Sequence, residues 1–160
     1  MCNAAHYLVE VGSTKELAST VEAAMKAFHQ TSLVTQDPLA YARLCSSAAL
    51  ERGMSGDFAS AQTLLATARD ILRCELKLPP DHEDVWGVMN NLGNLHLSLE
   101  NYPEALRHHL ICKETVDHAV EGNVIMNYEN LGRCYTGLGR YGDAMGYFDK
   151  VKEQREFGFR

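Results

Sequence analysis

Apolar residues recur along the chain at the spacing of amphipathic helices. Between residues 61 and 72 they occupy positions i, i+3, i+4 and i+7, which share one helical face: Ala61, Leu64, Leu65, Ala68, Ile71 and Leu72. No stretch of useful length alternates apolar and polar residues in the manner of a strand. The pattern therefore predicts an all-α fold.

Turn and capping residues divide this pattern into paired helices. Asp37 precedes Pro38, a combination typical of a helix N-terminus. The tripeptides GDF (56–58) and GRY (139–141) suit short turns, because glycine can end a helix in a left-handed conformation. The segment LKLPPDHED (76–84) holds two prolines that stop a helix and an aspartate that can cap the next one.

Two segments, NNLGNLHLSLENYPEAL (90–106) and ENLGRCYTGLGRYGDAM (129–145), are copies of one pattern. Their shared residues lie 39 positions apart: Asn91/Asn130, Leu92/Leu131, Gly93/Gly132, Leu99/Leu138, Tyr102/Tyr141 and Ala105/Ala144. Steps of 44 residues back from Ala105 reach two weaker copies, in the first of which Ala48 and Ala49 replace Leu92 and Gly93. Four units of two helices each are therefore expected, at about 1–33, 37–77, 81–121 and 123–157.

Small and large residues within a unit are placed as two packed helices require. Gly93 and Ala105 are small, which lets the helices approach closely, while Leu92, Leu99 and Tyr102 would fill the space around that contact. A single helical hairpin cannot bury both of its faces, so neighbouring units must stack. We expect about eight helices in a single array over residues 1–160.

The pattern resembles the tetratricopeptide repeat, which has a large residue, Leu-Gly, an aromatic residue, Ala, an aromatic residue and Ala. The third unit supplies Met89, Leu92, Gly93, His96, Ala105, His109 and Cys112 at these positions. The fourth supplies Tyr128, Leu131, Gly132, Tyr135, Ala144, Phe148 and Val151. The long period, against about 34 residues for the ordinary repeat, is similar to the repeats of kinesin light chains, Leu-Gly-Asn adaptors and fungal nucleotide-binding receptor-like proteins.

This resemblance implies a right-handed superhelical solenoid that acts as a non-catalytic protein–protein interaction module. Front helices of such arrays line a concave groove that takes a peptide or partner segment. The positions that the family's geometry turns toward the groove are Arg43, Ser47, Asn90, Asn91, Asn94, Leu97, Glu129, Asn130 and Arg133. Asn94 and Asn130 resemble an asparagine ladder on a peptide backbone, because an amide both donates and accepts hydrogen bonds. Alternatively, Asn91 and Asn130 would only join neighbouring helices.

The segment RHHLIC (107–112) is a candidate for other chemistry. His108 and Cys112 stand at i and i+4, a spacing that can chelate a metal. His109 and Cys112 also fall on repeat positions that pack between helices, so we expect packed side chains and no metal there. The sequence lacks GxSxG, HExxH and a glycine-rich phosphate loop, and we therefore predict no enzymatic activity and no cofactor.

Charge and composition narrow the class of partner. The formal net charge of −6 and the pI of about 5.6 argue against nucleic acid, whose phosphates need a basic face. No apolar run approaches the ~20 residues of a membrane span. The five cysteines are odd in number and form no CxxC pair, which favours a reducing compartment, and we expect a cytoplasmic protein.

The C-terminal end of the array is predicted to be uncovered. No further helix follows to cover Tyr147, Phe148 and Val151, and exposed apolar patches generally mark a contact. The chain would continue as a longer array, fold back, or associate with another copy through this end. The alternative function is thus self-association, or a structural role as the tail segment of a larger signalling receptor-like protein.

Overall fold

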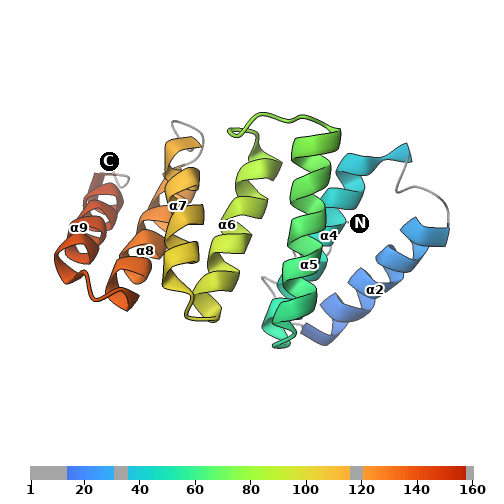
Figure 1. Cartoon of the computed structure of the whole chain (residues 1–160), viewed down its shortest axis with the longest axis horizontal. Helices are drawn as coiled ribbons and strands as arrows, with labels where there is room; N and C mark the ends of the chain where they lie inside the picture. The colour runs from blue at the N-terminus through green and yellow to red at the C-terminus, as the bar shows by residue number, and fades with distance from the viewer. Residues whose placement is uncertain (1–13, 31–35, 116–120, 158–160) are drawn as a thin grey trace. The chain divides into compact units, whose positions relative to one another are not determined.

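The computed structural model describes residues 14–30, 36–115 and 121–157, which are helical nearly throughout (Figure 1). The helices are α2 (Thr14–Gln30), α4 (Pro38–Met54), α5 (Phe58–Asp70), α6 (Glu83–Ser98), α7 (Tyr102–Thr115), α8 (Glu121–Gly137) and α9 (Tyr141–Phe157), and the π-helical segment η1 (Ile71–Glu75) continues α5. The described residues contain no strand, which confirms the all-α prediction. The helix expected ahead of α2 lies outside the described residues.

Contacts divide the chain into two compact units, Met1–Val88 and Met89–Arg160, with the boundary inside α6. In the first unit α4 and α5 form a hairpin, and α2 packs against α4 (Figure 1). The core of this hairpin consists of small and medium side chains: Ala42, Leu44, Cys45, Ala48, Ala49, Ala61, Leu65, Ala68 and Leu72 are all buried. The apolar face predicted for α5 therefore packs inward, with Leu64 only half-buried.

Capping residues set the ends of the first hairpin as the sequence predicts. The Asp37 carboxylate accepts a hydrogen bond from the Ala40 N–H at 3.0 Å, which satisfies a free donor at the start of α4. In the turn, Gly56 has φ +85°, a left-handed conformation that favours glycine. Asp57 then caps α5 by accepting from the Ser60 N–H at 3.2 Å.

The second compact unit contains the remainder of α6 together with α7, α8 and α9. Helix α7 packs against α8, and α8 forms a hairpin with α9 (Figure 1). The signature residues Leu92, Ala105, Leu131 and Ala144 are buried. Leu99 is not: we expected it to fill the space between helices, but it is 43% exposed, because it lies in the turn that follows the last residue of α6.

Gly93 and Gly132 are glycines because rings rest directly on them. A Cβ built on Gly93 would lie 2.6 Å from Nε2 of His109, and one built on Gly132 would lie 2.7 Å from Cε1 of Phe148. Real Cβ atoms do not approach other atoms so closely, so only glycine admits these rings at the present helix spacing. The close approach predicted for the Leu-Gly pair is confirmed in both repeats.

Tyr102 joins successive hairpins of the second unit. Its ring lies against Gly137 at the end of α8, so closely that a Cβ at that position would overlap it. Leu97, Ala105 and Cys134 form a buried cluster beside it, and Tyr102 packs against that cluster. These contacts hold α6, α7 and α8 together. The polar residues predicted to face the groove on α6 and α8 therefore belong to helices that pack firmly against α7.

Candidate partner-binding surface

The four groove residues predicted on α6 differ in how exposed they are and in whether their side chains already have partners within the chain. Asn90 is 5% exposed, and Leu97 is buried in the core cluster with α7 and α8. Asn91 is half-buried and its interactions are already engaged within the chain. Asn94 is half-buried, and its Oδ1 has no hydrogen-bond partner among the described residues. That oxygen is itself buried, so any accessible part of the Asn94 amide is its nitrogen end.

On α8, the predicted residues form a short polar group. Asn130 is 5% exposed, and its Oδ1 accepts a hydrogen bond from Nη1 of Arg133 at 3.3 Å. Glu129 is ion-paired with Arg155 of α9. Arg133 is exposed and forms no ion pair with any residue that the structure describes. Asn130 thus orients the Arg133 guanidinium through one hydrogen bond, and no described carboxylate neutralises its charge.

The two residues predicted on α4 are engaged within the first compact unit. Arg43 forms a two-pronged ion pair with Asp84, with Nε 2.7 Å from Oδ1 and Nη2 2.8 Å from Oδ2. Its Nη2 also lies 3.5 Å from Oε1 of Glu83. The Ser47 hydroxyl donates to the Arg43 carbonyl oxygen at 3.1 Å, a bond inside the helix. Both side chains are therefore already engaged within this unit.

A buried histidine lies beneath the α6 and α7 contact. His109 is 0% exposed and Asn127 1% exposed, and neither side chain reaches hydrogen-bond geometry with a described residue. Burial lowers the pKa of His109 to about 4. The nearby Asn127 amide acts in the opposite direction, while His108 and Arg133 lower this pKa further. His109 is accordingly a neutral, packed side chain at physiological pH.

The cysteines are placed for packing and poorly for chemistry. Burial raises the pKa of Cys45 to about 11, of Cys112 to about 12 and of Cys134 to about 11. Such thiols stay protonated near neutral pH and are weak nucleophiles. His108, His109 and Cys112 are all buried, in line with the packing expected for the RHHLIC segment. Within the described residues, no three His, Cys, Asp or Glu side chains are grouped as metal ligands.

Residues 80–156 match the family model of the tetratricopeptide repeat. This part of the chain consists of tetratricopeptide repeats. Tetratricopeptide repeats generally mediate protein–protein interaction and are generally non-catalytic scaffolds. No curated protein matches the chain. Of the helices that the structure describes, none is long and apolar enough to cross a membrane.

The tetratricopeptide-like fold extends beyond the matched residues. The chain is similar to the crystal structure of BtubC (BKLC) from P. vanneervenii, with a TM-score of 0.80 at 22% sequence identity over 96% of this chain. It spans 61% of the length of that protein. The likeness confirms the prediction of a solenoid of tetratricopeptide-like helical hairpins, the first compact unit included.

A ring and cation cluster in the second unit was not predicted. Tyr135 and Tyr147 stack with centroids 5.5 Å apart, and Nζ of Lys150 lies 5.0 Å from the Tyr147 ring. The Arg140 guanidinium lies 4.7 Å from the Tyr135 ring. Such contacts contribute about 0.5–1 kcal/mol each at exposed sites. They stabilise the α8–α9 hairpin. The several tyrosines in that hairpin are the sequence feature from which such contacts could have been predicted.

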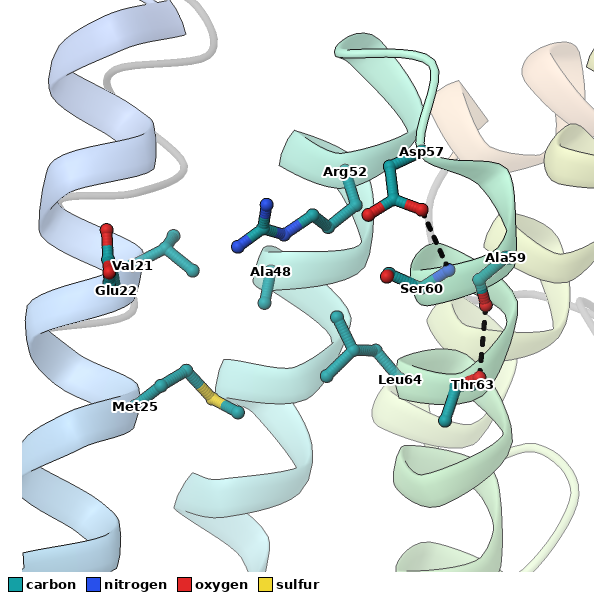
Figure 2. A pocket seen from close by; sticks show the side chains of 10 residues that line it. All are labelled: Val21, Glu22, Met25, Ala48, Arg52, Asp57, Ala59, Ser60, Thr63 and Leu64. Atoms are coloured by element: carbon teal, nitrogen blue, oxygen red, sulfur yellow. Dashed lines mark hydrogen bonds between the residues drawn. The ribbon is translucent and has the colours of Figure 1, made fainter.

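A cleft in the first compact unit was also not predicted. It lies among α2, α4 and α5, and Figure 2 shows the side chains around it. The signal in the sequence was the small Ala48, which stands where the later repeats have Leu92 and Leu131. The repeat signature is weaker at this position, and the signature alone does not predict an open cleft.

Proposed function

We propose that the protein binds a segment of a partner protein through the face of α6 and α8 that carries Asn94, Asn130 and Arg133. The observation that carries the proposal is the arrangement of Arg133, an exposed guanidinium oriented by Asn130 and without an ion pair among the described residues. Asn94 occupies the position equivalent to Arg133 in the preceding repeat, 39 residues earlier, and is half-buried. These two residues supply polar groups to a partner.

The packed helices beneath this surface favour binding. A partner segment loses conformational entropy when it binds. A surface that is already ordered loses little further entropy, which favours binding. The Asn94 amide nitrogen can donate to a peptide carbonyl, and Arg133 can donate to a carboxylate or a carbonyl. Because Glu129 is already neutralised by Arg155, it does not oppose an anionic group near Arg133.

The test is capture of partners from the source cell with three forms of the protein. The Asn94→Ala/Arg133→Ala double variant should lose partners that the wild type retains, with little change in melting, because Arg133 is exposed and the Asn94 side-chain oxygen makes no hydrogen bond with a described residue. Arg107→Ala is the matched control, since it removes an exposed arginine of α7 that pairs with Glu104 at 2.9 Å. If the double variant captures the same partners as the control, this surface is not the binding site.

A second candidate, self-association, is favoured by the exposed apolar side of α9. Tyr141 and Met145 are each 66% exposed, and Leu138 is 36% exposed. The equivalent Tyr102 of the preceding repeat is covered by Gly137. Light scattering after size exclusion should show a concentration-dependent dimer that Met145→Glu abolishes. Met145 suits this test because Phe148 rests on Gly132 and would disturb the fold if changed.

A further inference from the structure

The cleft of the first compact unit has the size of a ligand site. It measures about 650 Å³, within the range of about 300–1,000 Å³ typical of pockets that enclose a small ligand. Val21 of α2 and Ala48 of α4 form its buried floor, and the half-buried Met25 and Leu64 pack against them (Figure 2). An apolar side chain entering from solvent would meet Met25 and Leu64 first, and methionine adapts its shape readily.

The room in this cleft follows from one small residue. Ala48 stands where the third and fourth repeats carry Leu92 and Leu131, both buried. In those repeats the leucine fills the space between packed helices. In the second repeat the alanine leaves that space open to solvent between α2 and α5 (Figure 2).

Charged residues at the rim give the cleft a negative balance. Glu22, Arg52 and Asp57 are the charged side chains that line it. Arg52 already has a partner outside the cleft lining, because its Nε lies 3.4 Å from Oε2 of Glu51. Within the described residues neither Glu22 nor Asp57 forms an ion pair. Arg52 nevertheless acts on Asp57 electrostatically and helps to lower its pKa, so the three charged side chains together leave one net negative charge at the entrance.

Two hydrogen bonds among the lining residues affect the charge and the free donors of the cleft. The hydrogen bonds from Ser60 lower the pKa of Asp57, so that this carboxyl stays ionised. The same bond places the negative charge of Asp57 at the N-terminus of α5, where the helix dipole favours it. The Thr63 hydroxyl donates to the Ala59 carbonyl oxygen at 3.0 Å, so its hydrogen is also engaged (Figure 2).

We propose that this cleft binds a segment of a partner protein in which a leucine-like side chain is flanked by lysine or arginine. The apolar side chain would cover Met25 and Leu64, and the cation would pair with Glu22 or Asp57. The net charge of −6 favours the approach of such a segment. This site is separate from the α6 and α8 surface and does not depend on the function proposed for it.

Three capped peptides provide the probe: acetyl-Leu-Lys-Leu-amide, acetyl-Leu-Glu-Leu-amide and acetyl-Ser-Lys-Ser-amide. Binding is followed through the ¹³C-labelled methyl group of Met25, which lies in the cleft. The Leu-Lys-Leu peptide should shift this signal with a dissociation constant of about 1 mM or lower. The other two peptides should bind at least about tenfold more weakly, since each lacks one of the two features.

Variants of the cleft separate its shape from its charge. Ala48→Leu installs the residue of the later repeats, and Ala59→Trp fills the cleft from an exposed position; both should abolish the shift. Gln62→Trp is the matched control, because it places the same ring on an exposed site of α5 outside the cleft. Asp57→Asn removes charge but keeps a good helix cap, and with Glu22→Gln it should weaken binding about tenfold.

The proposal is overturned if no peptide shifts the Met25 signal, or if the Leu-Glu-Leu peptide binds as well as the Leu-Lys-Leu peptide. It is also overturned if Ala59→Trp and Gln62→Trp bind the peptide equally. Should Ala48→Leu fail to fold, Ala59→Trp still decides the matter. Arg133→Ala should leave peptide binding unchanged, so failure at this cleft is distinguishable from failure of the α6 and α8 surface.

Discussion

The second and fourth repeats pack their front and back helices together with different pairs of residues. In the fourth, Gly132 receives the ring of Phe148, sixteen positions later. In the second, the equivalent pair is Ala49 and Leu65, both buried. A larger residue on the front helix is thus matched by a smaller one on the back helix. The repeat therefore specifies the summed volume of the pair more strictly than either residue.

The neighbouring position shows what happens without such compensation. Leu131 is 0% exposed in the fourth repeat, whereas Ala48 of the second repeat lines an open cleft. The same helical hairpin is thereby a closed core in one place and a candidate ligand site in another. Differences between repeats carry functional information that the shared signature does not.

Leu131→Ala should recreate that gap in the fourth repeat and is the change with the largest expected effect. Removing a fully buried leucine costs about 2–5 kcal/mol, since both the transfer energy and the cavity count. Urea unfolding measures the loss. Leu138→Ala, at a residue 36% exposed, is the control and should cost less than about 1 kcal/mol. Equal losses would contradict the difference in packing between these positions.

Acid should destabilise the third repeat more than the fourth, because His109 stands where the fourth has Phe148. The unfolded chain protonates this imidazole near its ordinary pKa of about 6.5, but the folded chain does so only near 4. The free energy of unfolding is therefore at its full value, as far as His109 is concerned, above pH 6.5. It falls by up to about 3 kcal/mol as the pH falls from 6.5 toward 4.

The control for this acid effect is His109→Phe, which places the residue of the fourth repeat against Gly93. Urea unfolding at several pH values between 7.5 and 4 compares the two proteins. The variant should lose less stability on acidification than the wild type. Parallel curves would show that His109 is not responsible.

Gly132→Ala tests the paired-volume rule directly. The new Cβ would meet Phe148, and the net loss should be about 1–2 kcal/mol after the better helix propensity of alanine is included. Adding Phe148→Leu copies the Ala49 and Leu65 pair and should recover about 1 kcal/mol relative to additivity. A double-mutant cycle in urea measures this coupling.

Gly146→Ala is the matched control for that cycle. Nothing lies within 4 Å of a Cβ at Gly146, so this change should stabilise α9 by up to about 1 kcal/mol. If Gly132→Ala behaved like Gly146→Ala, the close contact with the Phe148 ring would be absent in solution.

Most of the fold could be predicted because its signals are local. The spacing of apolar residues, the cap at Asp37 and the glycines at Gly93 and Gly132 each act within one helix or one hairpin. The position of Leu99 could not be predicted as well, because its exposure depends on where α6 ends. Helix ends are the least certain part of such an inference.

The candidate site could be predicted only in outline. The repeat register predicts which positions of the front helices face the groove, but it does not tell which side chains already have partners within the chain. Asn130 and Glu129 have partners at Arg133 and Arg155, which depend on side-chain conformation and on another helix. Leu97 lies in the core because α7 and α8 cover it. Availability to a partner is a tertiary property that spacing does not encode.

The ion pairs Arg43–Asp84 and Glu129–Arg155 should contribute slightly different amounts to the free energy of unfolding. This is the smallest effect that we predict. Asp84, the partner of Arg43, is 14% exposed and held by two bonds, whereas Arg155 and Glu129 are 59% and 38% exposed. Arg43→Ala should cost about 1 kcal/mol, and Arg155→Ala less than about 0.5 kcal/mol. Unfolding in low and high salt compares them, since screening weakens the exposed pair more.

Arg155→Ala also sharpens the comparison at the proposed surface. It frees the Glu129 carboxylate four positions from Arg133, on the same side of α8. Freed from Arg155, this carboxylate competes for the guanidinium and repels an anionic partner. Binding of such a partner should therefore weaken although stability hardly changes. Restored binding in Glu129→Gln/Arg155→Ala would locate the effect at Glu129, and unchanged binding in Arg155→Ala would show that charge near Arg133 does not govern the partner.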